Sequence, residues 1–440
     1  MKNILKQIII YVLTLEARLV LRKYKPKIIA VTGNIGKTSS KDVIYTVLSS
    51  SFFVRKSERS FNSEIGIPLT ILGLPNAWSD VFSWSRNIIS GLKIIILKNH
   101  YPKWLIIEIG ADRPGDIESI SEWLKPDVVV ITHLPDVPVH VEFFSGVKEV
   151  VKEKSYLVKS LKDGGVFVVN GDDKRAFEMK TFAKDKKVFT YGFAEGSSIV
   201  ASNESITYEN NKPTGITFRV DHSGSSIPVE LKGVVGKQHV YPVLSALAVG
   251  ISQGLNIVTM KKALLEHKSA LGRMRLIEGI NNSTIIDDSY NASPTAVTEA
   301  LNTLKNINTD GRPSYVKAPV GKKIAVLGDM MELGEHSFDE HIKIGKLVAQ
   351  TADILITVGI RSKYIAQGAN EEKMKKKDIF QFNDSTQAGD KLADIIAEND
   401  IVLVKGSQSI RTEKIVEKVI AQPERKYKLL VRQGEEWQRR

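Results

Sequence analysis

A glycine-rich segment near the start of the chain has residue types that can bind phosphate. It is Thr32-Gly33-Asn34-Ile35-Gly36-Lys37-Thr38, and it continues an apolar run. Glycines let backbone N–H groups approach phosphate oxygens, and the N-terminus of the following helix adds positive charge. Lys37 would neutralise the outer phosphates, and the Thr38 hydroxyl would lie where a bridging Mg²⁺ binds. Residue 31 is valine rather than the glycine of the common pattern, so this segment alone predicts nucleotide binding and no more.

A carboxylate ends a second apolar run. Leu105-Ile106-Ile107 leads directly into Glu108, which places an oxygen ligand at the carboxyl end of an expected strand. Mg²⁺ is a hard cation that prefers oxygen ligands. A solvated glutamate at a strand end is the alternative, but the sequence Glu-x-Gly after an apolar run favours the metal site. His140 and Lys154 follow the next apolar run. Taken alone, such a histidine is more often packed or solvated than a ligand, and such a lysine indicates nothing.

Buried strands and one helix must position these groups. Ile28–Thr32, Leu105–Ile109 and Val128–Thr132 are typical of buried parallel strands, and Thr38–Ser49 has the pattern of a helix that follows the first of them. Together they predict a doubly wound α/β domain. Such sheets bind ligands beyond the carboxyl ends of their strands, where the phosphate-binding segment and Glu108 would both lie.

The pattern changes after residue 186. Alternating residues in Ile216–Val220, with turn residues on both sides, predict a small antiparallel β addition between residues 186 and 236. A buried helix is expected at Val243–Ile251. A second α/β block then begins near Gly272. Its strands are expected at Thr284–Ile286, Ile324–Leu327, Ile354–Val358 and Ile401–Val404.

Composition limits the classes of protein to which the chain can belong. Its 440 residues exceed one ordinary hydrophobic core, so two or three domains are expected. The absence of cysteine excludes disulfides, thiolate metal sites and a cysteine nucleophile, and it fits a reducing cytoplasm. The net charge of +12 favours an anionic partner, which could be nucleic acid, a membrane surface or a phosphorylated substrate. Because the lysines are scattered, a generally solvated basic surface is an equal alternative.

The first 25 residues predict a separate helix. Apolar residues recur at helical spacing at Leu13, Ala17, Val20 and Leu21. This is typical of an amphipathic helix. The run Ile8–Leu15 is followed by Glu16 and Arg18, well short of the roughly 20 apolar residues that a membrane span needs. No small-residue cleavage site follows, so a signal peptide is not expected. We expect this helix to pack on the body of the protein, with docking to a membrane surface or a partner as the alternative.

Eight ordered segments give the sequence a specific resemblance. They are Thr32–Thr38, Asn62–Leu69, Glu108–Gly110, His140 with Lys154, Gly272-Arg273, Asp287–Pro294, Leu327–Gly334 and Val404–Ser407. In this order they resemble the Mur ligase family of ATP-dependent amide-bond ligases. The resemblance is strongest to the MurF branch, which joins D-alanyl-D-alanine to a UDP-N-acetylmuramoyl tripeptide. It implies an N-terminal helix at 1–25, a central phosphate-loop α/β domain at 26–270 and a Rossmann-like α/β domain at 271–440.

The resemblance also implies roles for individual residues. ATP would be held by Thr32, Gly33, Asn34, Gly36, Lys37, Thr38, Ser39, His239, Arg273 and Asp288, with Arg273 on the γ-phosphate and Asp288 on the ribose. Two Mg²⁺ ions would be held by Thr38, Glu108, His140 and Lys154. Lys154 would be carbamylated, which turns a cation into an anionic oxygen ligand.

The remaining implied roles concern chemistry and substrates. The groups implied to be catalytic are Lys37, Glu108, His140, Lys154 and Arg273. The implied substrate contacts are Asn62, Tyr290, Asn291, Lys405 and Ser407, with Arg411 as a further contact. The substrates would be a muramoyl-peptide-like acceptor and a D-alanyl-D-alanine-like amine.

Two departures from the family pattern are visible. The phosphate-binding segment begins at residue 32, whereas the family's UDP-binding N-terminal domain takes most of a hundred residues before it. Only a short helix is therefore expected ahead of this segment. The second departure is on the side of the site that faces adenine, where Gln238, His239 and Pro242 stand in place of the family's usual His-Asn and later Asn.

Three hypotheses for function stay open. The first is a MurF-like ligase that forms an acyl phosphate in cell-wall synthesis. The second is a ligase of the same chemistry whose acceptor lacks UDP, and the third is a nucleotide-binding scaffold without turnover. Retention of Lys37, Glu108 and Arg273, together with His140 and Lys154, favours an enzyme, because a degenerate site should lose its metal ligands first. We expect a cytoplasmic monomer that acts on small molecules and not on nucleic acid.

Overall fold

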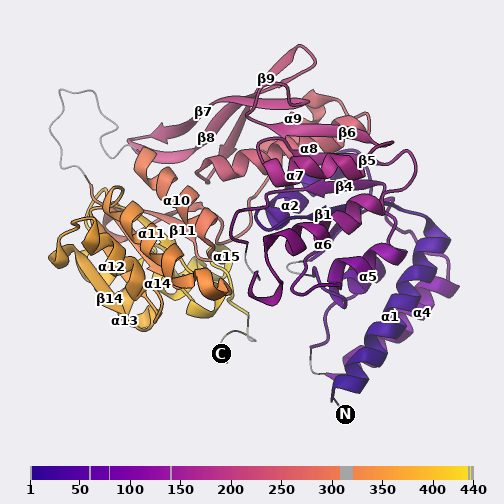
Figure 1. Ribbon diagram of the computed structural model, residues 1–440, viewed down its shortest axis with the longest axis horizontal. Helices are drawn as coiled ribbons and strands as arrows, with labels where there is room; N and C mark the ends of the chain where they lie inside the picture. Colours follow the sequence, from indigo (N-terminus) through magenta and orange to yellow (C-terminus); the bar gives the residue numbers. More distant parts are fainter. Residues whose placement is uncertain are drawn as a thin grey trace.

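Two mixed α/β blocks make up the protein (Figure 1). The computed structural model describes residues 2–58, 61–78, 80–138, 141–307, 321–434 and 437. In Figure 1 the first block runs from indigo to pink, and the second, in orange and yellow, lies beside it. The strands of the two sheets fall on either side of residue 270. The domain boundaries at 25 and 270 themselves stay a prediction.

The first sheet is mostly parallel. Within the described residues its strand order is β2-β3-β1-β4-β5-β6-β7-β8-β9. The strands are β1 (Lys27–Thr32), β2 (Val54–Lys56), β3 (Trp104–Glu108), β4 (Val128–Ile131), β5 (Val166–Asn170), β6 (Lys187–Gly192), β7 (Ile199–Glu209), β8 (Lys212–His222) and β9 (Ser225–Lys232). Pairs up to β6–β7 are parallel, and β7, β8 and β9 pair antiparallel. The predicted doubly wound core and its antiparallel addition are confirmed, and the addition extends the same sheet.

Helices cover both faces of this sheet, because side chains alternate along each buried strand. In β1, Ile28 and Ala30 belong to one core, and Ile29 and Val31 belong to the other. The first core includes residues of α1 (Lys2–Tyr24), α3 (Gly66–Leu72), α4 (Val81–Ile96), α5 (Asp116–Trp123), α6 (Val147–Lys159) and α7 (Lys174–Glu178). The second core includes residues of α2 (Lys37–Ser49), α8 (Val240–Ser252) and α9 (Ile257–Leu265).

The second sheet has the strand order β10-β11-β15-β12-β13-β14 within the described residues. These strands are β10 (Arg275–Glu278), β11 (Thr284–Asp288), β12 (Lys323–Gly328), β13 (Ile354–Val358), β14 (Ile379–Phe382) and β15 (Ile401–Lys405). One face packs on α10 (Pro294–Asn306), α11 (Ser337–Ala349) and α12 (Lys363–Glu371), and the other on α13 (Ser385–Ile395) and α14 (Glu413–Val419). The four expected strands are confirmed. Strands β10 and β14 were not predicted, because both are short edge strands that are only partly buried.

Helix α1 packs on the body of the protein, as expected. Leu13, Ala17 and Val20 are fully buried in the first core, where α1 contacts α3 and α4. The exposed side of α1 also carries apolar side chains, among them Ile8 and Tyr11. Among the described residues, no helix is long and apolar enough to span a membrane.

Glu16 lies on the packed side of α1. Its carboxylate lies so close to Gly91 of α4 that any Cβ at position 91 would overlap it. The residue is 3% exposed, and neither carboxylate oxygen has a hydrogen-bond partner among the described residues. Burial therefore raises the pKa of Glu16 to about 7.

Glu16→Gln is expected to stabilise the protein at pH 8 but not at pH 4. The folded-state pKa of about 7 exceeds the unfolded value of 4.5, so the folded state binds more protons in that window. Stability is then lost as the pH rises from 4.5 to 7, and the full loss, at most about 3 kcal/mol, remains above it. Glutamine stays neutral and avoids this cost. Urea unfolding at both pH values measures the difference, with the exposed Glu122→Gln as the control. An equal effect of Glu16→Gln at pH 4 and pH 8 would contradict the assignment.

Candidate functional site

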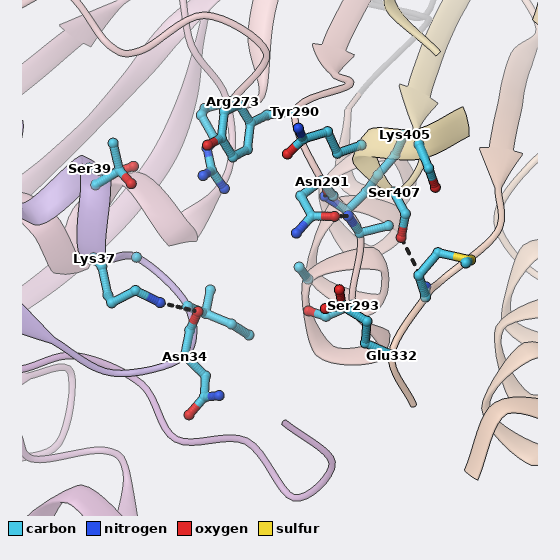
Figure 2. A pocket seen from close by; sticks show the side chains of 18 of the residues that line it. Asn34, Lys37, Ser39, Arg273, Tyr290, Asn291, Ser293, Glu332, Lys405 and Ser407 are labelled. Atoms are coloured by element: carbon cyan, nitrogen blue, oxygen red, sulfur yellow. Dashed lines mark hydrogen bonds between the residues drawn. The ribbon is translucent and has the colours of Figure 1, made fainter. Parts of the chain in front are cut away.

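A cavity of 750 Å³ lies where the carboxyl ends of the two sheets approach each other. The segment after β1 and Glu108 of β3 form one wall, and residues that follow β11, β12 and β15 form the other. Figure 2 shows Lys37 on one side of this space and Asn291, Lys405 and Ser407 on the other. Crevices outside the carboxyl ends of parallel strands are where open α/β sheets bind ligands.

Two glycines shape the phosphate-binding segment. Gly33 has φ 142°, and a Cβ atom there would overlap the side chain of Thr132, which follows β4. Gly36 has φ 86° and begins α2 without a side-chain hydrogen-bond cap. Since no side chain caps this end of α2, the first-turn N–H groups of Lys37 and Thr38 are suited to bind an anion. Both residues line the cavity.

Lys37 folds back over this segment. Its Nζ donates to the carbonyl oxygens of Gly33 at 3.0 Å and Asn34 at 3.3 Å. Burial lowers the pKa of Lys37, and the nearby Glu108 carboxylate opposes that shift. The ammonium is therefore held by neutral oxygens, which a phosphate oxygen can replace with a stronger charge-assisted contact.

Glu108 and Thr38 form a pair of oxygen ligands. The Thr38 hydroxyl donates to Oε1 of Glu108 at 3.1 Å. Glu108 is 2% exposed, and its Oε2 has no hydrogen-bond partner among the described residues. Lys41 Nζ lies 3.7 Å from that oxygen. A buried carboxylate oxygen without a hydrogen bond, next to a hydroxyl, fits a Mg²⁺ site.

Lys154 lies on α6 behind the cavity wall. It is 2% exposed, and burial, followed by the Lys37 charge, lowers its pKa to about 7. Among the described residues there is no cluster of three or more His, Cys, Asp or Glu that could hold a metal. His140, the third expected metal ligand, lies outside the described residues. The second metal site therefore stays a prediction.

The opposite wall depends on a buried ion pair. Lys405, at the end of β15, donates from Nζ to Oδ2 of Asp288 at 2.6 Å and to the Asn291 carbonyl at 2.8 Å. Burial lowers the pKa of Lys405, and the Asp288 carboxylate opposes the shift. Asp288 is itself buried and is not among the residues that line the cavity. In this position Asp288 holds the ammonium of Lys405. The contact between Asp288 and the ribose stays a prediction.

Arg273 and Tyr290 lie together at the junction of the two blocks. The Arg273 guanidinium carbon is 4.1 Å from the centroid of the Tyr290 ring, which is cation–π geometry. Both residues line the cavity. Arg432 donates to the Tyr290 carbonyl at 2.9 Å and pairs with the buried Glu413 at 2.5 Å. Arg432 therefore holds the Tyr290 backbone in place at this end of the cavity.

Most of the predicted site residues meet in this cavity. Those that line it are Asn34, Gly36, Lys37, Thr38, Ser39, Asn62, Glu108, Arg273, Tyr290, Asn291, Lys405, Ser407 and Arg411. The residues Thr32, Gly33, Lys154, Asp288 and His239 are not among those that line it. His239 lines a separate narrow slot beside Ser39 and His267. Its Nε2 has no partner among the described residues, and burial lowers its pKa to about 4, so its ring is neutral.

Several cavity residues were not assigned a role from the sequence. Met331 and Glu332 line the wall after β12, and the Met331 N–H donates to Ser407 Oγ at 2.9 Å. Both lie in the segment Leu327–Gly334, which contributes to the family resemblance, but the sequence did not indicate what either residue does. Trp437 also lines the cavity and stacks on Arg411, with its ring centroid 5.3 Å from the guanidinium carbon. The charged C-terminal sequence around Trp437 gave no sign of this.

Asn62 connects the main cavity to a second one of 510 Å³. Its side chain lies against Gly110, where a Cβ atom would be 2.8 Å from Nδ2. Lys6 and Ile10 of α1 line the second cavity, together with Arg113 after β3. The space beside Asn62 therefore extends toward α1.

Two family models match the chain. One describes the Mur ligase middle domain and matches residues 89–250. The other describes the Mur ligase glutamate ligase domain and matches residues 272–408. The first range includes Glu108 of one wall but begins after the phosphate-binding segment, and the second range includes Arg273, Tyr290, Lys405 and Ser407.

Individual relatives agree with these matches. The UDP-N-acetylmuramoyl-tripeptide–D-alanyl-D-alanine ligase of Bacillus subtilis is 27% identical over 411 residues, which cover 92% of this chain and 79% of the relative. The Escherichia coli ligase of the same name is 26% identical, covering 89% and 76%. The solved structure of Thermotoga maritima MurF ligase in complex with ADP has a TM-score of 0.73 at 24% identity, covering 93% of this chain and 83% of that one. At this identity the solved structure shows a shared fold.

Gly33→Ala is expected to weaken ATP binding at least about tenfold, because the new methyl group must displace the segment from Thr132. Isothermal titration calorimetry with a non-hydrolysable ATP analogue measures the affinity. Gly164→Ala is the matched control, since Gly164 also has positive φ but has open space around its Cβ position. An alanine strains the backbone at both positions, by roughly 1–3 kcal/mol at each. Unchanged affinity in Gly33→Ala, or equal loss in Gly164→Ala, would contradict this role of the segment.

Proposed function

This chain belongs to the Mur ligase family, and we propose that it is an ATP-dependent, ADP-forming amide-bond ligase of peptidoglycan synthesis. The proposed reaction adds D-alanyl-D-alanine to a UDP-N-acetylmuramoyl-tripeptide-like acceptor. The observation that carries the proposal is the single cavity in which Lys37, Thr38 and Glu108 face Arg273 and Lys405. A cytoplasmic location and a monomeric state belong to the proposal as well.

The charge of the cavity suits this chemistry. ATP and the acceptor carboxylate are both anions, so bringing them together requires positive charge. Lys37, Arg273, Lys405 and Arg411 all line the cavity and come from both of its walls. Their placement on two blocks means that the full set of cations is present only where the blocks meet.

The first proposed step forms an acyl phosphate. A carboxylate oxygen of the acceptor attacks the γ-phosphorus of ATP, and the bond from phosphorus to the bridging oxygen breaks to release ADP. Lys37 and Arg273 would neutralise charge on the transferred phosphoryl group. A Mg²⁺ ion held by Thr38 and Glu108 would supply further positive charge at the β- and γ-phosphates.

The second proposed step forms the amide bond. The amine nitrogen of the dipeptide attacks the acyl carbon, the bond from that carbon to the phosphate oxygen breaks, and a proton leaves the nitrogen. Lys405 would hold the carboxylate of the dipeptide, because Asp288 fixes its ammonium in place. The position of the cavity between two blocks would limit water, which otherwise hydrolyses the acyl phosphate.

Lys154 is proposed to act as a carbamate. At its pKa of about 7, half of this lysine is the neutral amine at pH 7, and that form attacks CO₂ to make an N–C bond and release a proton. The product carries anionic oxygens that a second Mg²⁺ could bind together with Glu108 and His140. An ordinary lysine, whose pKa is 10.5, would be almost entirely protonated under the same conditions.

Phosphate release tests the reaction directly. The purified chain with ATP and Mg²⁺ is supplied with UDP-N-acetylmuramoyl tripeptide, with D-alanyl-D-alanine, and with both. Release is expected only with both, because the acyl phosphate accumulates until an amine arrives. Lys37→Met is the control and should abolish release. Release with an acceptor that lacks UDP would favour the second ligase hypothesis, and ATP binding without release across all acceptors would favour the scaffold.

Lys154→Ala is expected to lower kcat by at least about a hundredfold, because a metal ligand is lost. Short carboxylates such as acetate should restore part of the rate by supplying the missing oxygens. The wild type should also need more added bicarbonate below pH 7, where the Lys154 amine becomes protonated. Lys152→Ala, an exposed change on the same helix, is the control. Normal turnover in Lys154→Ala, measured as phosphate release, would rule out the carbamate.

A further inference from the structure

Helix α1 exposes an apolar face that its packing does not use. Ile4, Ile8, Tyr11, Leu15 and Leu19 follow one another at intervals of three or four residues, so they form one stripe. Their exposed fractions are 67%, 54%, 71%, 47% and 37%. The packed face already buries Leu13, Ala17 and Val20, so these outer side chains contribute little to the core.

Helix α4 continues this apolar surface. Phe82 is 88% exposed and Ile96 is 75% exposed, and Ile89, Leu92 and Leu97 are each about half exposed. The two helices contact each other and lie side by side at one edge of the molecule (Figure 1). Lys23 of α1 donates to the carbonyl of Ile95 at 2.8 Å, which ties α1 to the end of α4. We call the exposed side of this pair the α1–α4 face.

Basic side chains surround these apolar residues. The exposed ones on or next to the two helices include Arg18, Arg22, Lys23, Lys25, Arg86, Lys93 and Lys98. Within 2–25 and 80–98 the sequence has two acidic residues, the exposed Asp80 that caps the start of α4 and Glu16, which is buried between the helices. With its pKa raised to about 7 by burial, the Glu16 carboxyl is half neutral at pH 7 and more so below it. The α1–α4 face therefore combines apolar area with a strong excess of positive charge.

We propose that the α1–α4 face docks onto the surface of an anionic lipid bilayer. Helices that lie in a membrane interface bury one apolar face between the headgroups and acyl chains, and their Lys and Arg side chains pair with anionic lipids. Long basic side chains can reach the headgroups while their stems lie on apolar surface. With 23 residues, α1 has a length of about 35 Å, which suits a helix lying along the surface.

Charge argues against a second copy of this chain as the occupant. A symmetric dimer through this face would place the same patch on both partners. Arg18, Arg22 and Lys93 would then lie opposite an equally basic surface, with no exposed acid in either helix to pair with them. Like charges across an interface oppose association, whereas an anionic bilayer complements them.

The second cavity lies on a different side of α1 from the α1–α4 face. Lys6 and Ile10, which line that cavity, are each two residues from Ile8, so they do not share a side of α1 with the α1–α4 face. The docking itself does not depend on which reaction the site performs.

Vesicle co-sedimentation of the full chain tests the proposal without substrates. Vesicles of equal parts phosphatidylglycerol and phosphatidylcholine are compared with pure phosphatidylcholine vesicles, at low and high salt. The wild type is expected to sediment with the anionic vesicles, and less so at high salt because screening weakens the charge contacts. The variant Ile4→Gln/Ile8→Gln/Leu15→Gln should lower the partition coefficient at least about tenfold. So should Arg18→Gln/Arg22→Gln.

The matched control is Val258→Gln/Leu265→Gln, which removes two exposed apolar side chains from α9. It should bind vesicles as the wild type does, and the thermal unfolding midpoints of all variants should agree, since every changed side chain is exposed. No binding of the wild type to anionic vesicles would overturn the proposal. So would equal losses in the control. A lipid-free dimer in sedimentation velocity that the α1 variant abolishes would assign the face to a second copy instead.

Discussion

A buried carboxylate, Glu108, constrains the catalytic end of the first sheet. An ionised carboxylate loses several kcal/mol of hydration on burial unless partners replace the water. Here the partners are the Thr38 hydroxyl, the Lys41 ammonium and, for the Glu108 N–H, the Ser57 hydroxyl. They come from α2 and from the segment after β2, so two other parts of the chain must converge on the end of β3. Gly33 allows this convergence, because its missing Cβ lets the segment pack on Thr132.

The second sheet meets the same constraint with the opposite charge. Lys405 is buried at the end of β15 and is held by Asp288 at the end of β11, the neighbouring strand. Removing Asp288 would leave a buried ammonium with only a carbonyl to hold it, which is costly. The two walls are thus each built around a buried charge that the strand ends position. The space between the walls would offer an anionic ligand both the N-terminus of α2 and the cations Lys37, Arg273 and Lys405.

The local sequence pattern was sufficient to predict the strands whose ends position these buried charges. Strands β1, β3, β4, β12, β13 and β15 are continuous apolar runs because both of their faces are buried. Edge strands β10 and β14 lack that signal. The pairing of Lys405 with Asp288 could not be predicted, because it depends on β11 and β15 being neighbours across 117 residues of sequence. Trp437 likewise reaches the cavity through tertiary packing, which a charged terminal sequence does not reveal.

Helix α1 marks another limit of periodicity. A buried stripe at helical spacing correctly predicted that Leu13 and Val20 pack on the body, but it carries no information about the opposite face. That face is apolar as well, and α4 repeats the feature beside it. Scattered exposed apolar residues need no explanation, whereas a contiguous surface across two adjacent helices does. The core packs without these side chains, and exposed apolar area favours aggregation. Their presence beside basic residues therefore supports the proposal that a binding partner covers this surface.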